Sequence, residues 1–272
     1  MTRRHRRHSA RGFTLAEVAV VLVIVSLLIA GLMIPLATQI DLRNQADTQR
    51  TMDQIKDAMI GYVVANGRLP CPADGTIAAG ATNAGTEQCA GTVVYYGVVP
   101  WATLGTPETD AWGRRFSYWV SPVYTDAIAA GTVNTTGQSP TCTTTVPPAQ
   151  AQASFALCTA GNMVVYNRND ATHATVALGT ALPVVIISHG KNGSGAYSTR
   201  GTLLSAPAAG TDEAANATHA DTTTFYWRTQ TPGGSGCSDT AGGSPYCQFD
   251  DIVTMITGPV LAARMVAAGK LP

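Results

Sequence analysis

The chain has 272 residues, only 12% of them are charged, and its formal net charge is zero. All of its charge asymmetry lies at the front, where the first eleven residues carry five arginines and no acid; 12 basic and 17 acidic side chains follow. Binding to phosphates needs lysines and arginines clustered on a folded surface, so this balance argues against a nucleic acid as a partner.

An apolar run follows the basic start. Residues 18–40 contain no charged side chain, and a helix of that length covers about 35 Å, enough to cross the hydrocarbon core of a bilayer. By the positive-inside rule the basic leader stays in the cytoplasm and the rest of the chain is exported. Cleavage as an ordinary secretory signal, at Ala30, Gly31 or Ala37, remains an alternative.

A short motif links the leader to the apolar run. Residues 12–17 read GFTLAE, and together with the basic leader and the uncharged run they resemble the cleavage and methylation signal of type IV prepilins and type II secretion pseudopilins. The resemblance implies that a prepilin peptidase cuts between Gly12 and Phe13 on the cytoplasmic face, and that the new amine of Phe13 is N-methylated. It covers residues 1–66 firmly and the rest loosely.

Glu17 lies at the mouth of the apolar run, where an ionisable group is costly unless it has a partner. The resemblance implies that its carboxylate meets the charged Phe13 amine of a neighbouring subunit in a filament, so that each charge offsets the desolvation of the other. Glu17 would then set the register of assembly. The alternative is a carboxylate at the membrane interface, favoured by the N-terminus of its own helix.

The helix is expected to continue beyond the membrane. Residues 39–66 turn more polar but keep apolar side chains three and four residues apart, which indicates one stripe facing a core. These positions are Met52, Ile55, Met59, Ile60 and Val63. The pair Asn66 and Gly67, with Pro70 beyond it, predicts the end of the helix.

The sequence therefore divides into four parts: a basic leader (1–12), a transmembrane half-helix (13–38), an amphipathic half-helix (39–66) and an exported head (67–272). Gly31 and Pro35 lie inside the transmembrane half. Proline removes a backbone donor, so this stretch is expected to kink or to extend on assembly. An ordinary tolerated proline of a membrane helix is the alternative.

The fold class is predicted to be α+β, with an antiparallel sheet of the head packed on the long helix. Stretches rich in β-branched and aromatic residues predict the strands, at 92–101, 114–124, 162–167, 182–188, 223–230 and 252–256. Residues 126–160 and 193–221 are expected to be loops. Near the C-terminus apolar residues recur at helical spacing before a capping Gly269; they are Val260, Leu261, Met265 and Val266.

One stretch of the head resembles the segment that opens the sheet of major pseudopilins. It spans residues 109–120 and reads TDAWGRRFSYWV. The resemblance implies that Asp110 and Gly113 shape a turn, while Trp112 and Phe116 pack it down. This role is structural.

The six cysteines form an even set, and in an oxidising compartment they are expected to be bridged. The tentative pairing joins neighbours along the chain: Cys71 with Cys89, Cys142 with Cys158, and Cys237 with Cys247. Other connectivities stay open, since sequence cannot choose among them. A zinc site is disfavoured because the chain has no C-x-x-C and no histidine at ligand spacing from a cysteine pair.

The sequence predicts neither catalysis nor a cofactor. Ser188 beside His189 suggests a nucleophile and its base, but neighbouring strand residues point to opposite faces and no third group orients the histidine. In major pseudopilins a calcium ion can tie down a later loop. The resemblance makes calcium at Asp250 and Asp251 the alternative to no cofactor, although no oxygen-rich run surrounds them.

These observations predict a structural subunit of a type IV pilus or a type II secretion pseudopilus, and a minor one because the head is large. The expected partners are other pilin or pseudopilin subunits, the prepilin peptidase and the inner membrane. The chain would cross that membrane once, with its amino terminus in the cytoplasm and its head in the periplasm, and then join the filament. The alternative is a membrane-anchored exported binding domain or enzyme that joins no filament.

Overall fold

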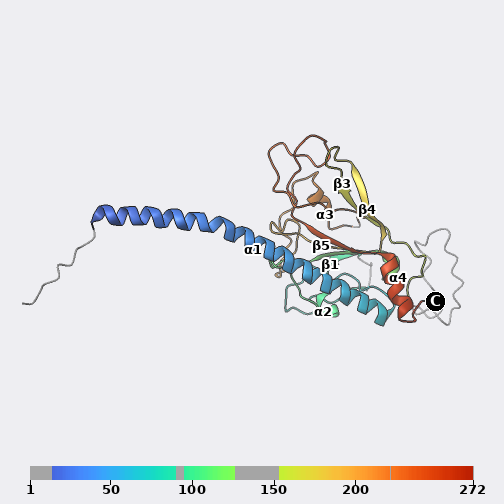
Figure 1. Ribbon diagram of the computed structural model, residues 1–272. Helices are drawn as coiled ribbons and strands as arrows, with labels where there is room; N and C mark the ends of the chain where they lie inside the picture. Colours follow the sequence, from blue (N-terminus) through green and yellow to red (C-terminus); the bar gives the residue numbers. More distant parts are fainter. Residues whose placement is uncertain (1–13, 90–94, 126–152, 221, 272) are drawn as a thin grey trace, which may run out of the picture. The chain divides into compact units, whose positions relative to one another are not determined.

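The structure is a computed structural model that describes residues 14–89, 95–125, 153–220 and 222–271, with the backbone alone at 30–37 (Figure 1). The chain forms two compact units, Met1–Asn44 and Gln45–Pro272. One long helix, α1 (Leu15–Asn66), begins in the first unit and ends in the second. Helices and antiparallel strand pairs make the fold α+β, as the sequence predicts.

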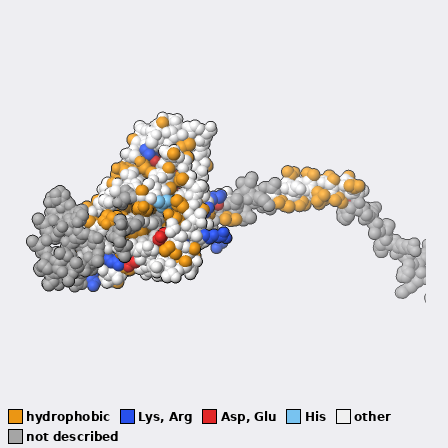
Figure 2. All heavy atoms as spheres, turned by 180° about the vertical axis from the view of Figure 1, so that it is seen from behind, with side chains coloured by type: hydrophobic (Ala, Val, Ile, Leu, Met, Phe, Trp, Pro, Cys, Tyr) orange, Lys and Arg blue, Asp and Glu red, His pale blue; other side chains and the backbone are white. Residues whose placement is uncertain are grey.

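The first part of α1 exposes apolar side chains along its length, as Figure 2 shows. Eleven large apolar residues between Leu15 and Ile29 are 43–92% exposed. Within the described residues, no helix offers a stretch that is both long and apolar enough to cross a membrane. The predicted span, residues 13–38, lies partly outside those residues and stays a prediction.

The second part of α1 packs on the head through the stripe that its sequence predicts. Met52, Ile55, Met59 and Val63 are at most 1% exposed, and Ile60 packs against the same core. The helix ends at Asn66, because Gly67 adopts a φ of 70° and donates its N–H to the carbonyl of Val63. This left-handed cap is the helix end that Asn66 and Gly67 predict.

A four-stranded sheet lies against α1, and its neighbouring strands all run antiparallel. Its order is β1 (Tyr96–Val98), β2 (Ser117–Val120), β5 (Val184–Ser188) and β7 (Ile252–Ile256). Every residue of β2 and β5 is buried, because the sheet is covered on both faces. Side chains such as Tyr118 and Ile186 join the core with α1, while Trp119 and Ile187 join a second core.

The second core joins this sheet to a smaller one, where Trp119 meets Phe225 edge to face at 5.0 Å. The order of the smaller sheet is β4 (Thr175–Leu182), β3 (Met163–Arg168) and β6 (Thr224–Tyr226). Strands β3 and β4 are antiparallel and lie side by side in Figure 1, but β3 and β6 are parallel. The expected single antiparallel sheet is therefore two sheets, and one of them is mixed.

Short helices complete the head: α2 (Trp101–Leu104), η1 (Pro122–Tyr124), α3 (Asp212–Asn216) and α4 (Gly258–Ala267). Part of the expected loop 193–221 is thus helical, and the side chain of Thr211 caps α3. Residues 126–152 of the other expected loop, 126–160, lie outside the described residues. In α4 only Leu261 and Met265 are buried, and Val260 and Val266 are 45% and 44% exposed. The predicted cap, Gly269, has a φ of 67°.

Candidate assembly site and polar clusters of the head

The N-terminus of α1 is closed by a capping box made of Thr14 and Glu17. The Thr14 hydroxyl accepts a hydrogen bond from the N–H of Glu17, and one carboxylate oxygen of Glu17 accepts the N–H of Thr14 at 2.8 Å and its hydroxyl at 2.9 Å. This is the reciprocal S/T-x-x-E arrangement. Sequence analysis missed it, although the residues TLAE carry the signal. Gly12 and Phe13 lie outside the described residues.

The backbone of α1 stays helical through Gly31 and Pro35. The kink expected there remains a prediction.

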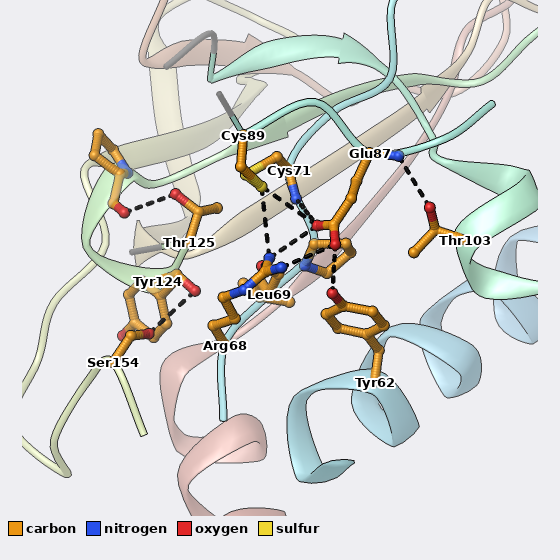
Figure 3. The surroundings of a disulfide bond; sticks show 12 residues. Tyr62, Arg68, Leu69, Cys71, Glu87, Cys89, Thr103, Tyr124, Thr125 and Ser154 are labelled. Carbon is orange, nitrogen blue, oxygen red and sulfur yellow. Dashed lines mark hydrogen bonds and ion pairs between the residues drawn. A yellow bond between two sulfur atoms is a disulfide. The ribbon is translucent and has the colours of Figure 1, made fainter. Parts of the chain in front are cut away.

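The other end of α1 is tied to the head by a compact polar network beside a disulfide (Figure 3). Glu87 accepts two hydrogen bonds from Arg68 at 2.8 Å, one from the Tyr62 hydroxyl at 2.7 Å and one from the backbone N–H of Cys71 at 3.0 Å. Cys71 in turn is bonded to Cys89. The first residues after the helix are therefore fixed both covalently and by charge.

A second disulfide joins Cys237 and Cys247. Both bonds link cysteines that are consecutive along the chain, in agreement with the tentative pairing. The third expected pair joins Cys142 and Cys158, and Cys142 lies outside the described residues.

The turn before β2 is built around the carboxylate of Asp110. One of its oxygens accepts the backbone N–H groups of Trp112 and Arg114, and the other accepts the hydroxyl of Ser188 at 2.7 Å. Gly113 supplies a φ of 80°, which glycine adopts without strain. Phe116 is fully buried and Trp112 is half-buried. Asp110 and Gly113 thus form the turn and Phe116 packs in the core, as expected, while Trp112 is only partly covered.

His189 lies between a serine and an aspartate, but the serine is not its neighbour in sequence. Its Nε2 is 2.8 Å from the hydroxyl of Ser117, and its Nδ1 is 3.5 Å from a carboxylate oxygen of Asp251. Ser188 points elsewhere, to Asp110. Sequence analysis found no group that could orient the histidine, whereas Asp251 lies in that position. Ser117 and His189 are 0% exposed, so a substrate has no access to this trio.

Asp250 and Asp251 meet a third carboxylate, that of Glu213, which sequence analysis did not single out. Ligand oxygens of the three lie within 4.8 Å of one another. Glu213 comes from α3, and the two aspartates stand directly before β7. The turn after β5 approaches closely, since a Cβ on Gly190 would collide with the carbonyl of Asp250. No local pattern could reveal this cluster, because Glu213 and Asp250 lie 37 residues apart.

Comparison with known proteins identifies the N-terminal segment. The family described as the prokaryotic N-terminal methylation motif matches residues 7–33. The chain carries a prepilin-type cleavage and methylation signal. No curated protein and no solved structure matches the chain.

The matched segment includes Gly12 and Phe13, where the sequence predicts cleavage, and also the capping box and Gly31. It is the signal that type IV pilins and pseudopilins carry, and it points to a structural protein of pilin type that is anchored in a membrane and exported. In general it implies processing by a prepilin peptidase and assembly with other pilin-type subunits.

Proposed function

We propose that this chain is a minor subunit of a type IV pilus or of a type II secretion pseudopilus. In this proposal a prepilin peptidase cuts between Gly12 and Phe13, Phe13 is N-methylated, and the mature subunit enters a filament through α1. The observation that carries the proposal is the prepilin-type signal at residues 7–33, which overlaps the start of the 52-residue helix α1. The minor role is inferred from the large head.

The proposed topology is a single pass through the inner membrane over residues 13–38, with the leader in the cytoplasm and the head in the periplasm. Five arginines in the leader support the orientation. Apolar side chains exposed on all sides of a lone helix favour burial in lipid or among other helices. The two disulfides favour an oxidising compartment such as the periplasm.

The capping box gives Glu17 a partner inside its own chain, so its role in assembly has to be separated from its role as a cap. Both hydrogen bonds from Thr14 end on the same carboxylate oxygen, Oε2. We infer that Oε1 accepts the methylated Phe13 amine of the neighbouring subunit in the filament. The cap would hold the carboxylate in place, and its charge would recognise the neighbour.

Two substitutions separate these roles. Glu17→Gln keeps the capping box, because glutamine serves at that position as glutamate does, but it removes the charge. Thr14→Ala removes the cap and keeps the charge. Each full-length variant is expressed in the host together with its filament machinery. Cleavage is read by mass spectrometry of the amino terminus, and incorporation by the amount of the chain in the sheared filament fraction.

We expect both variants to be cut after Gly12 and N-methylated at Phe13. Glu17→Gln should be lost from the filament fraction, whereas Thr14→Ala should be retained. Equal incorporation of Glu17→Gln and the unaltered chain would show that the cap is the whole role of Glu17. An amino terminus at Met1, or an unaltered chain that never enters filaments, would overturn the proposed function in favour of an anchored exported domain.

A further inference from the structure

Strand β4 is the longest strand among the described residues, and it forms one edge of the smaller sheet. It spans eight residues and pairs with β3 along one side (Figure 1). No other described strand lies along its second side. An open edge of this length offers its backbone groups to any other strand, and for that reason natural sheets protect such edges with charges, prolines or a covering segment.

The sequence of β4 does not protect its edge. Residues 174–182 read ATVALGTAL and contain neither a charged residue nor a proline. Val176 and Leu178 are 50% and 47% exposed. The other edge strands of the two sheets are shorter, since β1 and β6 have three residues each and β7 has five. Of the described edges, that of β4 is therefore the one best suited to take up another strand.

The hydrogen bonds to β3 show which backbone groups of β4 point outward. In an antiparallel pair alternate residues turn their N–H and C=O toward the partner strand. The carbonyl of Ala174 accepts the N–H of Asn169, so Ala174 and Val176 face the β3 side. Thr175 and Ala177 turn their backbone groups to the open side, where no backbone group of another described segment bonds them. The register with β3 is regular over residues 175–177 and shifts only beyond them.

We propose that β4 pairs in the antiparallel direction with β4 of a second copy of this chain, about a two-fold axis at Val176. Thr175 of one copy exchanges backbone hydrogen bonds with Ala177 of the other, on both sides of the axis. Val176 lies opposite its own copy, in a pair without hydrogen bonds, where facing side chains come closest. The assembly closes at the dimer, because each copy uses this edge once.

The lack of charge on β4 favours an identical partner over a different protein. A charge on this edge would meet the same charge in a second copy and repel it, whereas a different partner is commonly recognised through opposite charges. Residues 174–182 carry charge of neither sign. Pairing also covers the exposed Val176 of both copies, which removes apolar surface from water. This inference concerns the head alone and does not depend on filament assembly.

The test measures the association of the full chain, purified in mild detergent, by sedimentation equilibrium over a range of concentrations. A short strand pair buries less than the roughly 800 Å² per partner of a stable complex, so we expect a reversible dimer with a dissociation constant in the micromolar range. Val176→Lys places like charges at the axis and should raise that constant at least about tenfold. Ala263→Lys, at an exposed position of α4, is the matched control and should leave it unchanged.

An exchange of charge separates lost pairing from lost folding and from association through the exposed apolar part of α1. Val176→Lys and Val176→Glu should each be monomeric at concentrations at which the unaltered chain is dimeric. Their equimolar mixture should dimerise again, because opposite charges then meet at the axis. A misfolded variant would not be rescued by mixing, and association through α1 would be the same in all of these samples.

Val176→Cys tests the register directly. Opposite residues of a pair without hydrogen bonds have Cα atoms about 4.5 Å apart, a distance that a disulfide spans. Mild oxidation should therefore join two copies of Val176→Cys and leave Ala263→Cys monomeric. The proposal is refuted if the unaltered chain is monomeric at every concentration, which would leave the edge to a strand of another protein. It is also refuted if Val176→Lys dimerises as the unaltered chain does, or if the mixed charge variants stay monomeric.

Discussion

Replacing Glu87 with glutamine tests how the end of α1 is held to the head. Glu87 and Arg68 have side chains that are each 21% exposed, and the carboxylate accepts four hydrogen bonds, from Arg68 twice, Tyr62 and Cys71. Glutamine has the same shape but no charge, and its amide group turns one acceptor into a donor. That donor would face the Arg68 guanidinium or the Tyr62 hydroxyl, from which Glu87 now accepts hydrogen bonds.

The cost follows from these contacts. A hydrogen bond to a charged group contributes about 1.5–3 kcal/mol. Glu87→Gln weakens the two bonds from Arg68 and reverses one acceptor, while part of the loss is relieved by water at this half-buried site. We expect the free energy of unfolding to fall by about 2–4 kcal/mol at pH 7. The matched control is Asp53→Asn, whose exposed ion pair with Lys56 should cost less than about 0.5 kcal/mol.

The dependence on pH gives a second signature. Burial opposes ionisation of Glu87, but the hydrogen bonds from Arg68 and Tyr62 outweigh burial and lower its pKa below the ordinary value of 4.5. A lowered pKa stabilises the fold fully above that ordinary value, and this contribution is lost as the pH falls through the folded value. The difference in the free energy of unfolding between Glu87→Gln and the unaltered chain should therefore become smaller at acidic pH.

Urea denaturation of the full chain in mild detergent, followed by tryptophan fluorescence from pH 3 to pH 7, measures both effects. The reasoning fails if Glu87→Gln and Asp53→Asn differ by less than about 0.5 kcal/mol at pH 7. It also fails if the effect of Glu87→Gln is the same at pH 3 as at pH 7.

Two further predictions concern stability of the head. Arg115 is fully buried and donates hydrogen bonds to Glu108 at 2.7 Å and to three backbone carbonyls, so Arg115→Met should lower the free energy of unfolding by about 3–5 kcal/mol in the same assay. The control is Arg50→Met, at a side chain that is 74% exposed, which should lower it by less than about 1 kcal/mol. Similar losses for both variants would contradict this account. Replacing Cys71 and Cys89 together with alanine opens a loop with a sequence separation of 18, which should lower the unfolding free energy by about 3 kcal/mol. An unchanged urea midpoint would show that the non-covalent network of Glu87 suffices.

Features that depend on near neighbours could be predicted from the sequence. The buried stripe from Met52 to Val63 follows from helical periodicity, and the helix end at Asn66 follows from the conformational freedom of Gly67. The cleavage sequence at residues 12–17 is itself local, and a family match covers it. The capping box of Thr14 and Glu17 is also encoded locally, in the residues TLAE, although the sequence analysis predicts for Glu17 only an ion pair with a neighbouring subunit or a favourable position at the helix N-terminus.

Strand β4 shows where local patterns fail. Six of the eight residues 175–182 are exposed, so they lack the alternation of buried and exposed positions that marks a half-buried strand. They form a strand because β3 offers a partner. The same limit applies to the parallel pairing of β3 with β6, which depends on the path of the chain between them.

The N-terminal signal, the long helix and the strands with strong β propensity follow from the sequence alone, because each is encoded in the order of adjacent residues. The contact of His189 with Ser117 and the meeting of Glu213 with Asp250 and Asp251 depend on the folded arrangement of the chain. The partners in both clusters lie tens of residues apart, so no spacing along the chain reveals them. They become neighbours when the strands pair and bury them. Burial also raises the pKa of Glu213 and Asp250, because it removes their carboxylates from water.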